Sequence, residues 1–250
     1  MNLGKGIDFS NASGPDGIRI YAIGDVHGRF DCLSRMHEMI ADEIARDRPA
    51  DWRIIHLGDY VDRGPQSREV LDFLARAQTA DERNITLLGN NDEGMLKFLA
   101  DPLDADVFID FGGFDTAASY GVELRTMPRR ELFESHRQLI EAVPEHHFAL
   151  LRDMPRSVSF GDFFFCHAGI RPGTALDAQS AHDLCWIRRE FLDHQQLYDK
   201  VIVHGHTPCR EPETCPNRIN VDTKAFATGR LTALVMESTE KRFISTDLGT

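Results

Sequence analysis

Long apolar runs are absent from this 250-residue sequence, and none approaches the ~18 residues that a membrane-spanning helix needs. The first 17 residues also lack the apolar stretch of a signal peptide. We therefore expect a cytoplasmic protein with no membrane partner. Residues 1–17, which contain Gly, Asn, Ser and Pro, are expected to form a flexible leader before one domain over residues 18–250.

Positive charge is also scarce. The chain carries 28 Lys and Arg against 40 Asp and Glu, for a formal net charge of −12, and no basic run interrupts the acidity. Such a surface repels phosphate backbones, which excludes an extended nucleic-acid interface. An anionic ligand would have to be held by local positive charge.

The cysteines are few and show no C-x-x-C spacing. Their odd number argues against a disulfide framework, and their spacing argues against a structural zinc site. We expect buried or free thiols at all five positions: Cys32, Cys166, Cys185, Cys209 and Cys215.

The first hundred residues alternate between strand and helix patterns. Apolar, β-branched runs at Ile18–Ile23, Trp52–Leu57 and Ile85–Leu88 each end at a glycine-containing motif, and helical spacing of apolar residues follows the first two. This rhythm, at intervals of about thirty residues, predicts βαβ units around a mostly parallel sheet.

The pattern changes after residue 100. Residues 101–150 contain short helical pieces and no strand run, so we expect a covering insertion. The remainder is mainly β, with expected strands at Val158–Phe160, Phe163–Cys166, Val201–Val203, Ile219–Val221 and Leu231–Met236. The predicted architecture is α/β, a sandwich of mixed β-sheets flanked by helices. The run Phe163–Phe165 is expected to be buried core.

Charged and polar motifs follow the predicted strands, at the edge where open α/β sheets bind ligands. They contain Asp25 and His27 in "GDVHG", Asp59, Asp62 and Arg63 in "GDYVDRG", Asn90 in "GNND", His167 in "FFCHAG", and His204 and His206 in "VIVHGH". In an extended strand, Asp25 and His27 would share one face. Oxygen and imidazole donors without thiolate suit Mn²⁺, Fe or Zn²⁺, and a carboxylate such as Asp59 could bridge two ions.

These motifs, together with "FFCHAGIRP" and "VHGHTP", resemble the signature set of the phosphoprotein phosphatases within the calcineurin-like metallophosphoesterases. "NRINVDT" and "TGRLTAL" resemble the bacterial branch of that family. The resemblance covers residues 18–235 and implies the sandwich fold and two divalent metal ions, of which manganese is favoured. It implies that one ion is held by Asp25, His27 and Asp59 and the other by Asp59, Asn90, His167 and His206.

The same resemblance implies that Arg63 contacts phosphate, that Asp62 orients a neighbouring catalytic histidine, and that an arginine in "DLCWIRREF" also contacts phosphate. We favour Arg188 over Arg189 for this second contact. An arginine fork explains how an acidic protein can bind a phosphate dianion.

The main functional expectation is a phosphatase of phosphoserine and phosphothreonine proteins in which a metal-bridging hydroxide attacks phosphorus. A nucleotide phosphoanhydride hydrolase similar to diadenosine tetraphosphatases is an alternative, and a non-catalytic phosphate-binding protein is another. The partner is therefore a phosphorylated protein or a nucleotide, and no oligomeric state is predicted.

One position departs from the family pattern. After the third strand that pattern resembles "GNHE" or "GNHD", whereas this chain has "GNND", so Asn91 stands where the general-acid histidine is expected. An amide cannot protonate a leaving oxygen, which predicts a rate loss of about 10²–10⁴, although it can still donate to Asp62. Asn91 is either a natural change or an introduced one, and the otherwise complete ligand set favours introduction.

Overall fold

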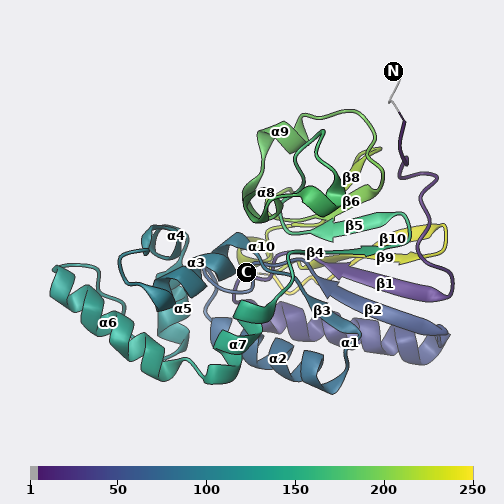
Figure 1. Cartoon of the computed structure of the whole chain (residues 1–250). Helices are drawn as coiled ribbons and strands as arrows, with labels where there is room; N and C mark the ends of the chain where they lie inside the picture. Colours follow the sequence, from purple (N-terminus) through teal and green to yellow (C-terminus); the bar gives the residue numbers. More distant parts are fainter. Residues whose placement is uncertain (1–4, 250) are drawn as a thin grey trace.

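The structure, a computed structural model, describes residues 5–249. Two five-stranded mixed sheets lie face to face, with helices on their outer faces (Figure 1). The strand order is β10-β9-β1-β2-β3 in the first sheet and β4-β5-β6-β8-β7 in the second. The α/β sandwich expected from the sequence is confirmed.

The first sheet contains the three strands predicted from the N-terminal rhythm. Its members are β1 (Ile18–Ile23), β2 (Asp51–His56), β3 (Asn84–Thr86), β9 (Thr232–Glu237) and β10 (Glu240–Ser245). Strands β1, β2 and β3 are parallel, whereas β9 pairs antiparallel with both β1 and β10. Parallel pairing brings the carboxyl ends of β1, β2 and β3 to one edge of the sheet.

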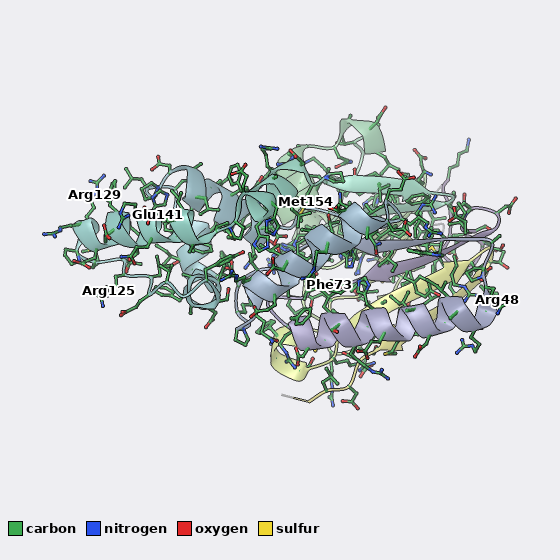
Figure 2. The ribbon with its side chains drawn as sticks, turned by 90° about the horizontal axis from the view of Figure 1, so that it is seen from below. Arg48, Phe73, Arg125, Arg129, Glu141 and Met154 are labelled. Carbon is green, nitrogen blue, oxygen red and sulfur yellow. The ribbon has the colours of Figure 1, made fainter. Side chains whose placement is uncertain are left out.

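Helices α1 (Phe30–Asp47) and α2 (Ser67–Ala80) cover the outer face of this sheet. Their buried residues recur at helical spacing, as in Leu33, Met36 and Ile40 of α1, which packs an apolar stripe against the strands. Figure 2 shows the two helices side by side, with Arg48 beyond the end of α1 and Phe73 on α2.

The second sheet supplies the remaining motif-bearing strands. It consists of β4 (Ser157–Phe160), β5 (Phe163–Cys166), β6 (Val201–His204), β7 (Glu213–Thr214) and β8 (Arg218–Asn220). Strands β5, β6 and β8 are parallel. The outer face carries the short helices η1 (Leu176–Ala178), α8 (Ala181–Trp186) and α9 (Arg189–Leu192), and α10 (Ala225–Thr228) follows β8.

The core between the sheets is built by alternation along the strands. Ile20 and Ala22 of β1 face Phe163 and Phe165 of β5 within one buried cluster. Phe164 points the other way, into the apolar layer beneath α8 and α9. The prediction that Phe163–Phe165 is core strand is therefore confirmed.

A helical lobe occupies the region expected to be an insertion. It comprises α3 (Asn90–Ala100), α4 (Asp106–Asp110), α5 (Gly113–Ser119), α6 (Arg129–Ala142) and α7 (Glu145–Asp153). Helix α6, marked by Arg129 and Glu141 in Figure 2, extends away from the sandwich.

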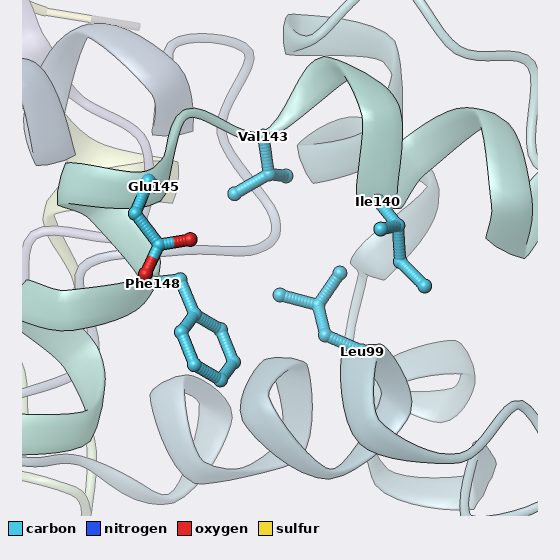
Figure 3. A pocket seen from close by; sticks show the side chains of 5 residues that line it. All are labelled: Leu99, Ile140, Val143, Glu145 and Phe148. Carbon is cyan, nitrogen blue, oxygen red and sulfur yellow. The ribbon is translucent and has the colours of Figure 1, made fainter.

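The lobe encloses a small pocket between α3, α6 and α7 (Figure 3). Leu99, Ile140, Val143 and Phe148 converge on it, and Glu145 stands at its rim. This apolar lining offers packing and no chemistry, so the functional site lies elsewhere.

The described part of the leader packs on the sandwich. Ile7 and Phe9 donate backbone hydrogen bonds to the carbonyls of Tyr198 and Pro216, at 2.9 and 2.8 Å, and Ala12 is fully buried. Lys241 Nζ donates to the carbonyls of Phe9 and Ala12. These contacts of residues 5–17 with Tyr198, Pro216 and β10 join segments far apart in the chain, which a sequence pattern does not reveal. Residues 1–4 lie outside the described residues.

Two further expectations concern thiols and membranes. All five cysteines are free, and Cys32, Cys166 and Cys185 are buried, as predicted. Over residues 5–249, no helix has both the length and the apolar character that a membrane span requires.

A pair of packed imidazoles joins α1 to β2. His37 Nε2 and His56 Nε2 lie 2.9 Å apart, and His56 Nδ1 donates to the carbonyl of Ile85. Burial lowers the pKa of His37 to about 4 and that of His56 to about 3. Both values lie below the ordinary 6.5, so the unfolded chain takes up protons first as the pH falls. The contribution of these two neutral imidazoles to the free energy of unfolding is therefore full above pH 6.5 and is progressively lost below it.

We predict that the free energy of unfolding falls between pH 7 and pH 5, with His56 alone contributing about 2 kcal/mol. Urea denaturation in the presence of a chelator measures this difference. The double variant His37→Leu, His56→Leu should lose that part of the pH dependence. An unchanged pH dependence in the double variant would contradict the assignment.

Candidate metal centre

The six candidate metal ligands meet at one edge of the sandwich. They follow β1, β2, β5 and β6 or begin α3, and each is at most 4% exposed: Asp25, His27, Asp59, Asn90, His167 and His206. Their donor atoms form two overlapping groups, Asp25–His27–Asp59 and Asp59–His167–His206, with Asn90 against His167. The structure thus brings together the six residues that the family resemblance implied as metal ligands.

Asp59 lies at the centre of the cluster. Its Oδ2 is 3.4 Å from His27 Nε2, and its Oδ1 is 3.3 Å from His167 Nε2. His167 Nε2 also lies 2.9 Å from Asn90 Oδ1. A carboxylate that faces an imidazole on each side is placed to share its oxygens between two ions.

The hydrogen bonds of the two imidazoles fix which nitrogen faces Asp59. His27 Nδ1 donates to the carbonyl of Val61 at 2.8 Å, and His167 Nδ1 donates to the carbonyl of Leu57 at 3.0 Å. In each neutral ring the lone pair is then on Nε2 and points at the Asp59 carboxylate. Lone pairs facing carboxylate oxygens leave a place for a cation, and the residues present fit a divalent metal.

The electrostatics of the cluster support this reading. Burial, together with the nearby charge of Asp222, raises the pKa of Asp25 well above its usual value. Burial alone would lower the pKa of His167, but the charge of Asp59, the hydrogen bond to it, and the charges of Asp25 and Asp92 together outweigh burial and raise that pKa to about 9. Both shifts express buried negative charge that lacks a compensating cation, which a divalent ion supplies.

The backbone adopts unusual conformations throughout this site. His27, Asp59, Asp62, Arg63 and His206 all have positive φ, between 45° and 69°. Each such residue costs on the order of 1 kcal/mol or more, and strain of this kind gathers at functional sites. The expectation that Asp25 and His27 share a face of an extended strand is wrong, because β1 ends at Ile23 and left-handed turns aim the side chains instead.

Asp92, which sequence reasoning missed, holds the loop that carries Asp59. Its buried carboxylate accepts hydrogen bonds from the backbone N–H groups of Asp59, Tyr60 and Gly89, at 2.8, 2.9 and 3.0 Å. The bond to Gly89 satisfies the N-cap N–H at the start of α3, which is the half of a capping box that needs no side chain on the N-cap residue. The acidic residue three positions after that glycine was the available signal.

Asn91 belongs to a buried chain of hydrogen bonds. Its Oδ1 accepts from Asn90 Nδ2 at 2.8 Å, which turns Asn90 Oδ1 toward His167, and its Nδ2 donates to Asp62 Oδ2 at 3.0 Å. The amide of Asn91 therefore makes the contact to Asp62 that the sequence suggested.

The chain of hydrogen bonds continues into the helical lobe through Thr116 of α5. Thr116 Oγ1 donates to Asp62 Oδ1 at 2.7 Å and accepts from the Asp62 N–H at 2.8 Å. Gly112, at φ 114°, lies so close to Arg63 that an added Cβ would stand 2.6 Å from the Arg63 nitrogen. The lobe thus contacts the backbone of both Asp62 and Arg63, which have left-handed conformations, and so orients Arg63. The sequence did not reveal this role of the lobe.

Positive groups and aromatic rings border the cluster. The guanidinium of Arg63 lies 4.9 Å and Lys224 Nζ 5.9 Å from the centre of the Phe226 ring. On another side, Arg188 Nε donates to His206 Nε2 at 3.0 Å, so Arg188 is turned toward the cluster. Its contact with phosphate stays a prediction.

A second set of rings follows Arg188 in space. Trp186 lies 6.4 Å from the His206 ring and 6.4 Å from that of Phe111, a lobe residue that is 38% exposed. Aromatic faces at the mouth of a polar site are suited to stacking with a planar ligand.

We predict that Thr116→Val weakens binding of inorganic phosphate about 10-fold, because it leaves the buried Asp62 carboxylate and N–H short of partners and loosens Arg63. Calorimetric titration in the presence of Mn²⁺ measures the affinity. Thr116→Ser should retain most of it, and Thr79→Val, on the exposed part of α2, serves as the control. Unchanged phosphate affinity in a folded Thr116→Val variant would refute the positioning role.

Comparisons with known proteins agree with this geometry. The pattern of the family described as calcineurin-like phosphoesterase matches residues 18–223. Among curated relatives, bis(5'-nucleosyl)-tetraphosphatase PrpE [asymmetrical] of Anoxybacillus flavithermus is 26% identical over 230 residues, covering 85% of this chain and 88% of that protein. The protein of the same name from Bacillus velezensis is 26% identical over 232 residues, covering 84% and 86%.

Solved structures share the fold. A putative diadenosine tetraphosphatase superposes with a TM-score of 0.65 at 18% identity, covering 94% of this chain and all of that one. A protein serine/threonine phosphatase from Saccharomyces cerevisiae gives 0.52 at 14% identity, covering 97% and 86%. With the family pattern spanning most of the sequence and both halves of the ligand cluster, the chain belongs to the calcineurin-like phosphoesterases.

Proposed function

We propose that this protein hydrolyses phosphoanhydride bonds of dinucleoside tetraphosphates. The curated relatives are named tetraphosphatases, and the alignment with this chain covers most of their length. This similarity supports the nucleotide alternative better than the protein phosphatase that was our main expectation. The observation that carries the proposal is the presence of Asn91 within an otherwise complete polar centre.

The metal ligands are proposed as the family resemblance implied them. Asp25, His27 and Asp59 hold one divalent ion, and Asp59, Asn90, His167 and His206 hold the other, with Mn²⁺ favoured and Fe or Zn²⁺ also suited to these donors. When bound, such a pair of ions polarises the phosphoryl group and activates water. The protein contributes the tautomers of His27 and His167 and the position of Asp59.

Two arginines hold the phosphates. Arg63, fixed by Thr116 and Gly112 through the backbone of its loop, presents its planar fork to one side of the centre, and Arg188 presents its own from the side of His206. Bidentate hydrogen bonds from such forks orient a tetrahedral anion and oppose the negative charge of the surrounding acids.

The rim fits the rest of a dinucleotide. Lys224 extends the positive charge beyond Arg63 along the ring of Phe226, which suits a chain of several phosphates. Trp186 and Phe111 offer ring faces on the other side for a base. A phosphoserine has only one phosphate and no base, so it would contact neither Lys224 nor the two rings in this way.

Asn91 is consistent with an anhydride and not with a serine ester. Breaking an ester expels an alkoxide, which needs a proton from a general acid, and the amide of Asn91 has none to give. Breaking an anhydride expels a phosphate group, whose last pKa is about 6, so it leaves as an anion without protonation. Under this proposal Asn91 is a natural residue of an anhydride hydrolase, contrary to the introduced substitution that the ligand set alone favoured, and its amide orients Asn90 and Asp62.

We predict that the protein loaded with Mn²⁺ splits diadenosine tetraphosphate into two unequal nucleotides and leaves a phosphoserine peptide almost untouched. Chromatography of the products measures both rates. Lys224→Gln should raise KM for the tetraphosphate several-fold more than KM for nitrophenyl phosphate, which has one phosphate. Preferential hydrolysis of the phosphopeptide would refute the proposal, and turnover of neither substrate would favour the non-catalytic alternative.

Replacement of the amide tests the role of the leaving group. Asn91→His should raise hydrolysis of a phosphoserine peptide by about 10²–10⁴, because it restores a proton donor beside Asp62. Rates for diadenosine tetraphosphate and nitrophenyl phosphate should change by less than about tenfold, because their leaving groups need little protonation. Steady-state kinetics on all three substrates provides the comparison. Equal gains for the three would show that Asn91 limits something other than proton donation.

A further inference from the structure

A second group of metal-binding side chains lies outside the centre, where the helical lobe meets the sandwich. Asp72 is on α2, and His146 and His147 are neighbours near the start of α7. The two helices lie side by side (Figure 1). Nothing in the proposed reaction uses these three residues.

The donor atoms are spaced as a small ion requires. Asp72 Oδ1 lies 2.9 Å from His147 Nε2 and 3.3 Å from His146 Nε2, and all three donors lie within 4.8 Å of one another. Ligands bound tetrahedrally to zinc at about 2.0–2.1 Å are separated by roughly 3.3 Å. The observed spacing is therefore close to that of a tetrahedral site before an ion draws the ligands together.

The surroundings of His147 suit a ligand. Its ring is fully buried, its Nε2 donates to Asp72 Oδ1 at 2.9 Å, and its Nδ1 lies 2.8 Å from the hydroxyl of Tyr120. Because that hydroxyl can either donate or accept, it can take the proton on Nδ1 when an ion replaces the proton on Nε2. Burial lowers the pKa of His147, so the ring is neutral at pH 7. A hydroxyl that fixes the tautomer is a usual supporting partner of a metal-bound histidine.

The site is also open to solution. The side chain of His146 is 58% exposed and that of Asp72 is 35% exposed, so an ion can enter and keep water as a fourth ligand. Two imidazoles and one carboxylate with an open position form a donor set typical of Zn²⁺.

We propose that Asp72, His146 and His147 form a third metal site, which binds Zn²⁺ and ties α7 of the lobe to α2. Helix α2 begins at Ser67, whose hydroxyl lies 3.0 Å from Thr116 Oγ1, so the same clamp stabilises the contact that holds Asp62. Zinc at this site stiffens the attachment of the lobe.

The test compares zinc contents. The full chain is dialysed against Zn²⁺, and bound zinc is measured by mass spectrometry for the parent, His146→Ala, Asp72→Asn and the control His194→Ala. The first two variants should each bind one equivalent less than the parent, and the control should match it. The variant Asp59→Asn, which removes a candidate ligand of the main centre, should bind one further equivalent of zinc less when His146→Ala is added to it. Failure of the main centre and failure of this site are therefore distinguishable.

Thermal unfolding gives a second measure. Added Zn²⁺ should raise the Tm of the Mn²⁺-loaded parent and of His194→Ala by several degrees, and should not raise that of His146→Ala, whose exposed side chain makes loss of folding a minor concern. Equal zinc contents in the parent and His146→Ala, or equal shifts in Tm, would overturn the proposal and leave the three residues as a hydrogen-bonded link between helices.

Discussion

The structure depends on one buried carboxylate, that of Asp59. Its oxygens lie 3.4 Å from His27 Nε2 and 3.3 Å from His167 Nε2, so a divalent ion beside either nitrogen would bind the imidazole and the carboxylate together. Three features keep it in place: Asp92 binds the backbone on which it stands, the N–H of Asn91 donates to its Oδ1, and its own φ of 54° turns the chain inward. Because β1, β2, β5 and β6 end at the same edge of the sandwich, ligands that are distant in sequence converge on this one side chain.

The proposed function depends on how the residues of that centre match the leaving group of the substrate. Asn91 retains the hydrogen bonds of the network, to Asn90 and to Asp62, while it gives up proton donation. Under the proposed function, candidate metal ligands and two arginines beside an amide that cannot donate a proton suit a substrate whose leaving group is already a stable anion. The positive and aromatic rim around Phe226 and Trp186 would contact the other phosphates and a base of a dinucleotide substrate.

Much of this organisation could be predicted from the sequence, and the exceptions have physical causes. Apolar β-branched runs located β1 to the residue, since burial on both faces leaves a strong pattern. In contrast, β7 is only two exposed residues, and β10, at a sheet edge, begins with three charged residues and has no apolar run or alternation. The motifs identified the ligands because their types are chemically distinctive. They did not reveal the left-handed turns at His27 and His206 or the support from Thr116, since these depend on contacts between segments far apart in the chain. For the same reason Asp72 and His147, 75 residues apart, form no sequence motif at all.

The central claim is that the cluster around Asp59 holds two divalent ions that share this carboxylate. Anomalous diffraction from crystals grown with Mn²⁺ tests it most directly. The account predicts two peaks in the cluster, one beside Asp25 and His27 and one beside Asn90, His167 and His206, with Asp59 contacting both. A single peak, or none in contact with Asp59, would contradict it.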